Sequence, residues 1–139
     1  MHAEEFLLQV REIDKEIKRQ EAIADSIRHS LEPKGVRYDQ DKVQSTPEDP
    51  IPKLIARLDE KLTEIRALRV RRAEIMHSID RLLDRLGDAD ERTALTHWYM
   101  LGEREEIVSE ALLCSTSTMY RIKARALQHV EALLKVDSD

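Results

Sequence analysis

Apolar or small residues recur in alternating steps of four and three along residues 3–32, with Gln20 as the one interruption. The members of this stripe are Phe6, Val10, Ile13, Ile17, Ala24, Ile27 and Leu31. Such spacing places the stripe on one side of a helix and is typical of coiled-coil packing. The pattern therefore predicts a first long helix over residues 3–32.

A second apolar stripe predicts a helix over about 53–86, formed by Ile55, Leu58, Leu62, Ile65, Met76, Ile79, Leu83 and Leu86 and widened by Leu54, Leu68, Ile75 and Leu82. Arg69 and Arg72 interrupt it, and their long stems can cover apolar surface while their charged ends stay in water. Between the two helices, residues 33–52 contain four prolines and one glycine. Because proline ends helices, this segment is predicted to be a connector, with a binding loop around Tyr38 as the alternative.

The two helices have similar lengths, and the segments 1–32 and 53–87 carry net charges of −3 and +3. We expect them to fold back as an antiparallel hairpin. Two helices alone bury too little apolar surface for a secure core. The hairpin is therefore predicted to pair with a second copy of the chain, which gives a homodimer.

Residues 88–139 are predicted to form three shorter helices. Gly87 is expected to end the second long helix in a left-handed cap, and Asp88 with Glu91 resembles a capping box. A helix over about 90–101, a break at Gly102, and helices at about 104–112 and 116–134 follow. The predicted fold is all-α, with a helical hairpin at 1–87 and a three-helix unit at 88–139.

Residues 105–124, EEIVSEALLCSTSTMYRIKA, have the layout of a helix-turn-helix. The apolar residues that pack the two helices together are Val108, Leu112, Met119 and Ile122. Ser109 supplies a small side chain at the crossing, and Cys114 fills the turn. Ser115 is expected to cap the second helix by accepting a bond from the N–H of Ser117 or Thr118.

A helix that enters the major groove of double-stranded DNA needs small polar and basic groups on its free face. The predicted base-facing residues are Ser115, Thr116, Ser117, Tyr120, Arg121 and Ala124. Lys123 and Arg125 flank this face and are expected to reach phosphates. Ordinary packing of two helices around a polar turn is the alternative interpretation.

The composition supports a helical fold, but the net charge gives less support to DNA binding. Charged residues make up 37% and aromatic residues 4%, which is typical of long solvated helices rather than sheets. The net charge of −5 argues mildly against nonspecific binding to nucleic acid. An acidic DNA-binding chain that contacts few phosphates is expected to bind weakly as a monomer and with a steep salt dependence. Binding would then depend on dimerisation or on a larger partner.

The C-terminal third resembles region four of bacterial sigma factors, and in particular the phage-encoded sigma-like regulators of late transcription of the ArpU and RinA type. The resemblance covers about forty residues and is carried by Tyr99, Gly102, Val108, Leu112, Ser115, Thr118, Met119, Tyr120, Arg121, Ala126 and Leu127. It implies binding to a promoter or another phage DNA site, with Thr116, Ser117, Tyr120 and Arg121 near bases or phosphates. Contact with host RNA polymerase is also implied. Trp98 and Leu113 depart from that pattern, which often has a basic residue and a glycine at these two positions.

No catalytic constellation is evident, so we predict that the chain is not an enzyme and needs no cofactor. The five histidines show no metal-ligand spacing with each other or with Cys114, and no histidine is placed to activate that cysteine. The single cysteine fits a reducing cytoplasm, and no signal peptide or membrane span is predicted.

Two other functions remain open from the sequence. A phage small terminase subunit also joins a helix-turn-helix to an oligomerising helical hairpin. Alternatively, the chain is an interaction protein that never contacts DNA. The number of copies in solution separates the first of these from a dimeric regulator.

Overall fold

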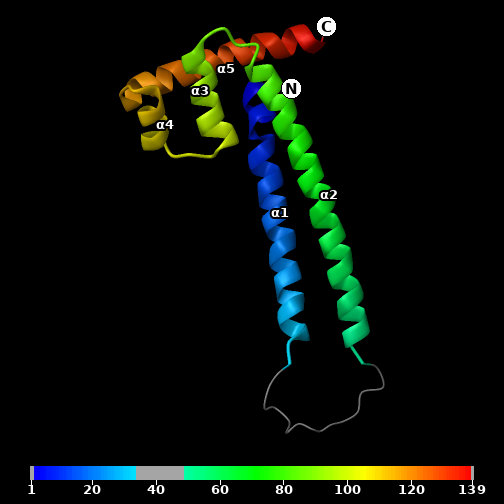
Figure 1. Cartoon of the computed structure of the whole chain (residues 1–139). Helices are drawn as coiled ribbons and strands as arrows, with labels where there is room; N and C mark the ends of the chain where they lie inside the picture. The colour runs from blue at the N-terminus through cyan, green and yellow to red at the C-terminus, as the bar shows by residue number, and fades with distance from the viewer. Residues whose placement is uncertain (1, 34–48, 139) are drawn as a thin grey trace. The chain divides into compact units, whose positions relative to one another are not determined.

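The computed structural model describes residues 2–33 and 49–138, and every regular element in these two ranges is a helix (Figure 1). In chain order the elements are α1 (Ala3–Leu31), α2 (Ile51–Leu83), α3 (Ala89–Leu95), the π-helix η2 (Thr96–Met100), α4 (Glu105–Leu112) and α5 (Thr116–Ser138). The prediction of an all-helical chain is confirmed. The expected connector around Tyr38 falls in residues 34–48, outside the described residues.

Two compact units divide the described chain. The first comprises residues up to Lys15 together with Val70 onward, and the second comprises Glu16–Arg69. Both α1 and α2 therefore contribute to each unit. The expected domain boundary between residues 87 and 88 stays a prediction.

The ends of α2 differ from the prediction for local reasons. The helix begins at Ile51, whose N–H donates to Asp49 Oδ1 at 3.0 Å, and Pro52 is tolerated in the first turn because its missing N–H would have no helical partner. After Leu83 the chain continues in tighter turns, whose hydrogen bonds join residues three apart. Leu86 N donates to Leu83 O at 3.0 Å. These tight turns need no left-handed residue. The predicted left-handed cap at Gly87 is wrong, and Gly102 has the positive φ of 63° instead.

Every helix of the first unit contributes buried apolar side chains. The unit's most deeply buried apolar side chains include Leu7, Val10, Ile79, Leu83, Leu95, Val108, Met119 and Val130. Phe6 was predicted to lie in the seam of the first helix but is only half-buried, and Leu7 is fully buried in its place. Ala3 N donates to Glu131 Oε1 of α5 at 3.3 Å, and Ala3 itself is buried. This contact directs the stripe of Ala3, Leu7 and Val10 toward the core.

The second unit buries far less. Its buried apolar residues are Ile17, Ala24 and Ile27 of α1 and Ile65 of α2. Gln20 lies among them at 4% exposure, with Nε2 donating to Glu16 Oε2 at 3.0 Å and no partner for Oε1 in the described chain. On α2, Ile55 remains 53% exposed. This unit therefore leaves apolar surface uncovered.

The two arginines that interrupt the apolar stripe of α2 each pair with an acid on α1. In the first unit, Arg72 Nε lies 2.6 Å from Asp14 Oδ1. In the second unit, Arg69 forms an ion pair with Glu21. The two arginines were expected to cover apolar surface with their stems. Their charged ends also form ion pairs with α1.

A buried carboxylate joins α3 to α5 in the first unit. Asp88 caps α3, as predicted, and its Oδ1 accepts from Asp90 N at 2.8 Å and Glu91 N at 3.3 Å. Glu91, which is 1% exposed, reaches α5 instead of completing the capping box. Its Oε2 accepts from Arg125 Nε at 2.8 Å, and its Oε1 lies 2.6 Å from His129 Nδ1.

We predict that Arg125→Gln destabilises the first unit more than Glu91→Gln does. Loss of the guanidinium leaves a buried carboxylate without its main counterion, which costs about 3 kcal/mol. Loss of the carboxylate leaves Arg125 and His129 half-exposed, where water can solvate them, which costs about 1–2 kcal/mol. Urea unfolding of both variants measures the difference. Arg104→Gln, at an exposed arginine, serves as the control and should change stability by less than about 0.5 kcal/mol.

Candidate nucleic-acid interface

The α4–α5 segment is two helices joined by a three-residue turn. Leu113, the first turn residue, adopts the left-handed conformation with φ 56° and ψ 45°. Cys114 is half-buried in the turn, and its N–H donates to Ser109 O at 3.1 Å. Ser115 Oγ accepts from Thr118 N at 3.2 Å, which is one of the two capping bonds predicted for it.

Apolar contacts hold α4 against α5. Val108 and Met119 are 0% exposed, Ile122 is 8% exposed, and Leu112 is half-buried, as expected for the packed side of this pair. Ser109 is also buried, and its Oγ has no hydrogen-bond partner in the described residues. A small side chain at that point therefore serves close packing rather than hydrogen bonding.

The other side of α5 is open within the first unit. Its exposed residues are Ser115, Thr116, Ser117, Tyr120, Arg121 and Ala124, which are the residues predicted to face bases. Ser117, Arg121 and Ala124 follow one another in steps of four and three and share one stripe of the helix. We call these six residues the open face of α5.

Tyr120 is the one member of the open face that is tied to another helix. Its hydroxyl donates to Glu105 Oε2 of α4 at 2.5 Å, and this bond to a carboxylate raises the pKa of Tyr120. The ring also meets Trp98 edge-on, with centroids 5.8 Å apart. Tyr120 therefore links α4, η2 and α5.

Lys123 lies among aromatic rings rather than extending outward. Its Nζ is 4.6 Å from the ring centroid of Trp98, 5.6 Å from that of Tyr99 and 5.9 Å from that of Tyr120. Burial lowers the pKa of Lys123. Tyr99 is itself buried, and its hydroxyl donates to Glu4 Oε2 of α1 at 2.9 Å. We call Trp98, Tyr99 and Tyr120 the aromatic cluster; the sequence interpretation did not connect it with Lys123.

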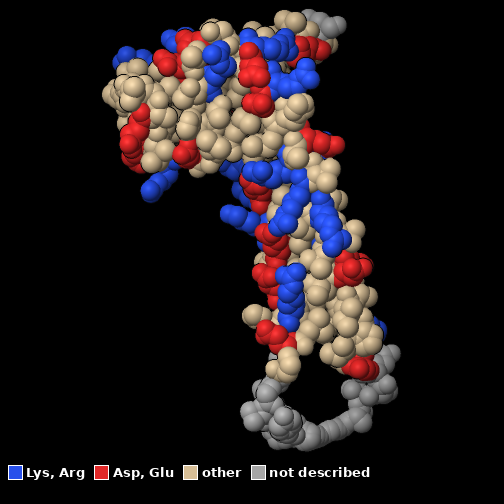
Figure 2. Space-filling model, in the orientation of Figure 1, with Lys and Arg blue, Asp and Glu red and all other residues tan. Residues whose placement is uncertain are grey.

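The charges around the open face are mixed. Arg125 is occupied by Glu91 and Asp88, whereas Arg121 is exposed and has no ion-pair partner within residues 2–33 and 49–138. Glu106 and Glu110 are exposed on α4, Glu106 near its start and Glu110 three residues before the turn. In the view of Figure 2, acidic and basic side chains are interspersed over the first unit. The geometry thus offers Arg121 as the available cation of the open face.

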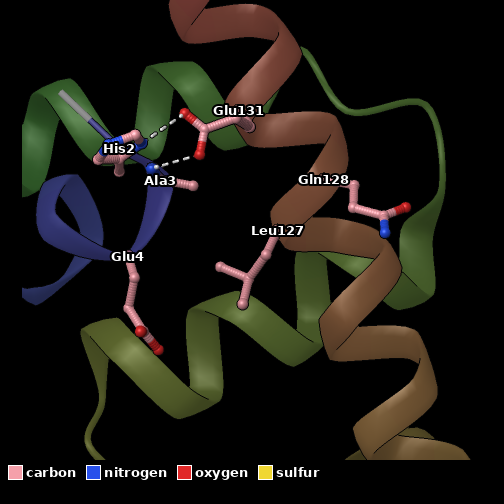
Figure 3. Close-up of a pocket in the computed structure, with 6 residues that line it drawn as sticks. All are labelled: His2, Ala3, Glu4, Leu127, Gln128 and Glu131. Carbon is pink, nitrogen blue, oxygen red and sulfur yellow. Dashed lines mark hydrogen bonds and ion pairs between the residues drawn. The ribbon is translucent and has the colours of Figure 1, made fainter.

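A separate groove of about 410 Å³ lies between the start of α1 and α5 (Figure 3). Its lining is His2, Ala3, Glu4, Leu127, Gln128 and Glu131. The carboxylate of Glu131 is already engaged by Ala3 N at 3.3 Å and by His2 Nδ1 at 3.5 Å. We interpret this groove as the place where α1 docks onto α5.

In the described part of the chain, two further kinds of site are absent. No group of three or more His, Cys, Asp or Glu side chains there is arranged to hold a metal ion. None of the helices in that part is both long and apolar enough to cross a membrane.

No known protein family, curated protein or solved structure matches the chain. The likeness to region four of sigma factors therefore stays a prediction from the sequence.

We predict that Leu113→Gly stabilises the first unit by about 0.5–1 kcal/mol. The left-handed conformation costs a residue with a Cβ about 1 kcal/mol, and glycine avoids most of this strain. Little packing is lost, because Leu113 is 93% exposed. Thermal unfolding measures the gain. Leu113→Ala is the matched control, since it keeps the Cβ and should not be stabilising.

Proposed function

We propose that residues 88–138 form a helix-turn-helix DNA-binding unit and that the chain is a sequence-specific regulator of transcription. In this proposal the full architecture is a long antiparallel helical hairpin followed by that unit. The open face of α5 enters the major groove of a DNA duplex. The packed side of α4 and α5 keeps the helix rigid while it does so.

The observation that carries the proposal is the combination of a tight turn with an uncovered helix face. A left-handed residue, a half-buried residue and a serine cap connect α4 to α5 in three positions. This turn resembles the short connection of a helix-turn-helix. The following helix has small polar residues and one arginine on its open face, which are side chains suited to base edges.

The charge distribution supports a need for more than one copy. Acidic residues on α4 flank the open face, and two of the three basic residues between 121 and 125 are engaged inside the first unit. Few phosphates can then be neutralised by each copy, which limits the affinity of a monomer. We propose that two copies of the chain associate through the uncovered apolar surface of the second unit, Glu16–Arg69.

We predict that Ser117→Glu abolishes binding to duplexes selected from a random DNA pool. The added carboxylate lies on the open face and repels the phosphate backbone, while an acid in the first turn of α5 favours the helix. Fluorescence anisotropy measures the binding. Ser78→Glu is the matched control, because it makes the same substitution at an exposed position on another helix of the first unit, α2. Equal losses in both variants would contradict a role for the open face.

We also predict that the wild-type chain is a dimer and that Ile55→Glu makes it a monomer. A charge at this exposed apolar position cannot be buried against a second copy without a large desolvation cost. Light scattering measures the mass of the particle. Ala56→Glu, at the exposed neighbouring position, should leave the dimer intact. Eight or more copies in the wild type would instead favour a DNA-packaging subunit.

A further inference from the structure

We propose that the basic residues of α5 have divided roles: Arg121 contacts a guanine edge in the DNA site, whereas Lys123 and Arg125 are positioning residues that contact no DNA. This inference rests on the proposed function and names the chemistry of its target. It departs from the sequence-based expectation that Lys123 and Arg125 reach phosphates.

Arg125 is held by the fully buried Glu91. Its Nε donates to Glu91 Oε2 at 2.8 Å, and a second nitrogen lies 3.4 Å from Asp88 Oδ2. Turning this guanidinium toward a phosphate would leave the Glu91 carboxylate buried with His129 alone. A buried charge that loses its counterion is costly, so the contact with Glu91 competes effectively with DNA. Arg125 therefore sets how α5 lies on α3.

Lys123 is held by the aromatic cluster. Its Nζ lies over the Trp98 ring at 4.6 Å and near the rings of Tyr99 and Tyr120. An ammonium group over aromatic faces is attracted by their negative π-face, most strongly where water is excluded. Tyr99 is bonded to Glu4 and Tyr120 to Glu105, so the rings around the ammonium are themselves fixed. Lys123 thus joins α5 to η2.

Arg121 has neither restraint. It is exposed, Ser117 and Ala124 on its stripe are small, and its other neighbour, Arg125, is held by Glu91. A guanidinium group presents paired N–H donors that match O6 and N7 of guanine. Small neighbours let the helix approach the bases closely enough for that contact. The methyl group of Ala124, one turn further on, is suited to contact a thymine methyl group.

This division changes the expected response to salt. If Arg121 contacts a base and the other two cations stay internal, α5 neutralises almost no phosphate. Each neutralised phosphate contributes a slope of about −0.9 to a plot of log K against log salt concentration. The slope per copy should then be shallow, about −2 or less in magnitude, and not steep as the sequence alone suggested.

The test uses the full chain and duplexes that the wild type selects from a random pool. Arg121→Lys keeps the charge but removes the fork of donors, so it should lose about tenfold or more in affinity for the selected site and most of its preference over other sequences. Replacing the contacted guanine by 7-deazaguanine should weaken the wild type and leave Arg121→Lys almost unchanged. Lys123→Gln and Arg125→Gln should lower the melting temperature yet keep both the selected sequence and the salt slope. Lys123→Arg, which keeps a cation over Trp98, should restore the melting temperature.

The outcomes separate the two proposals. Failure of the wild type to bind any duplex in the pool would overturn the proposed function itself. Tight binding by the wild type, with Arg121→Lys equal to it, would overturn the guanine assignment alone. A salt slope that becomes shallower by about 1 in Lys123→Gln or Arg125→Gln, with the melting temperature unchanged, would show that the residue contacts a phosphate.

Discussion

The pairing of Glu91 with Arg125 and His129 determines which side of α5 is available to a partner. A carboxylate at 1% exposure needs a counterion, which Arg125 supplies, and His129 of the same helix lies beside it. The side of α5 that carries these two residues is thereby turned toward α3, together with the buried Ala126 and Val130. Arg121 lies next to Arg125, four residues before it, and the stripe of Ser117, Arg121 and Ala124 is left in solvent. The open face therefore borders directly on an ion pair that is made on the adjacent side of the helix.

Periodicity was sufficient to predict the α-helices, because apolar stripes and caps are local features of the chain, but the helix expected over about 90–101 is α3 followed by the π-helix η2. The starts of α4 and α5, the cap at Ser115 and the burial of Val108 and Met119 agree with the prediction. The errors occurred where contacts between distant parts of the chain determine which residues are buried and where a helix ends. Leu7 replaced Phe6 in the core because the start of α1 docks on α5, and Gly87 was not needed as a cap because tighter turns end α2.

The candidate interface was only partly accessible to sequence reasoning for a similar reason. Exposure of Ser117, Arg121 and Ala124 follows from helical spacing relative to the packed residues. The engagement of Lys123 and Arg125 depends on Trp98 and Glu91, which lie on other elements and are remote in the chain. The number of basic residues on a helix therefore overestimates how many of them are available to contact a partner. In this chain, much of the local charge is engaged in internal structure.

The π-helix η2 imposes a constraint of its own on the length of the chain. Its closing bond runs from Leu101 N to Thr96 O at 3.0 Å, so the turn accommodates one residue more than an α-turn would. Removal of residue 96 or 97 would convert this turn into an ordinary α-turn and shift Trp98 and Tyr99 by about 100° around the helix. Trp98 and Tyr99 could then no longer both face α5. Most surface segments tolerate the deletion of one residue, but this turn does not. The number of residues between α3 and α4 is therefore fixed.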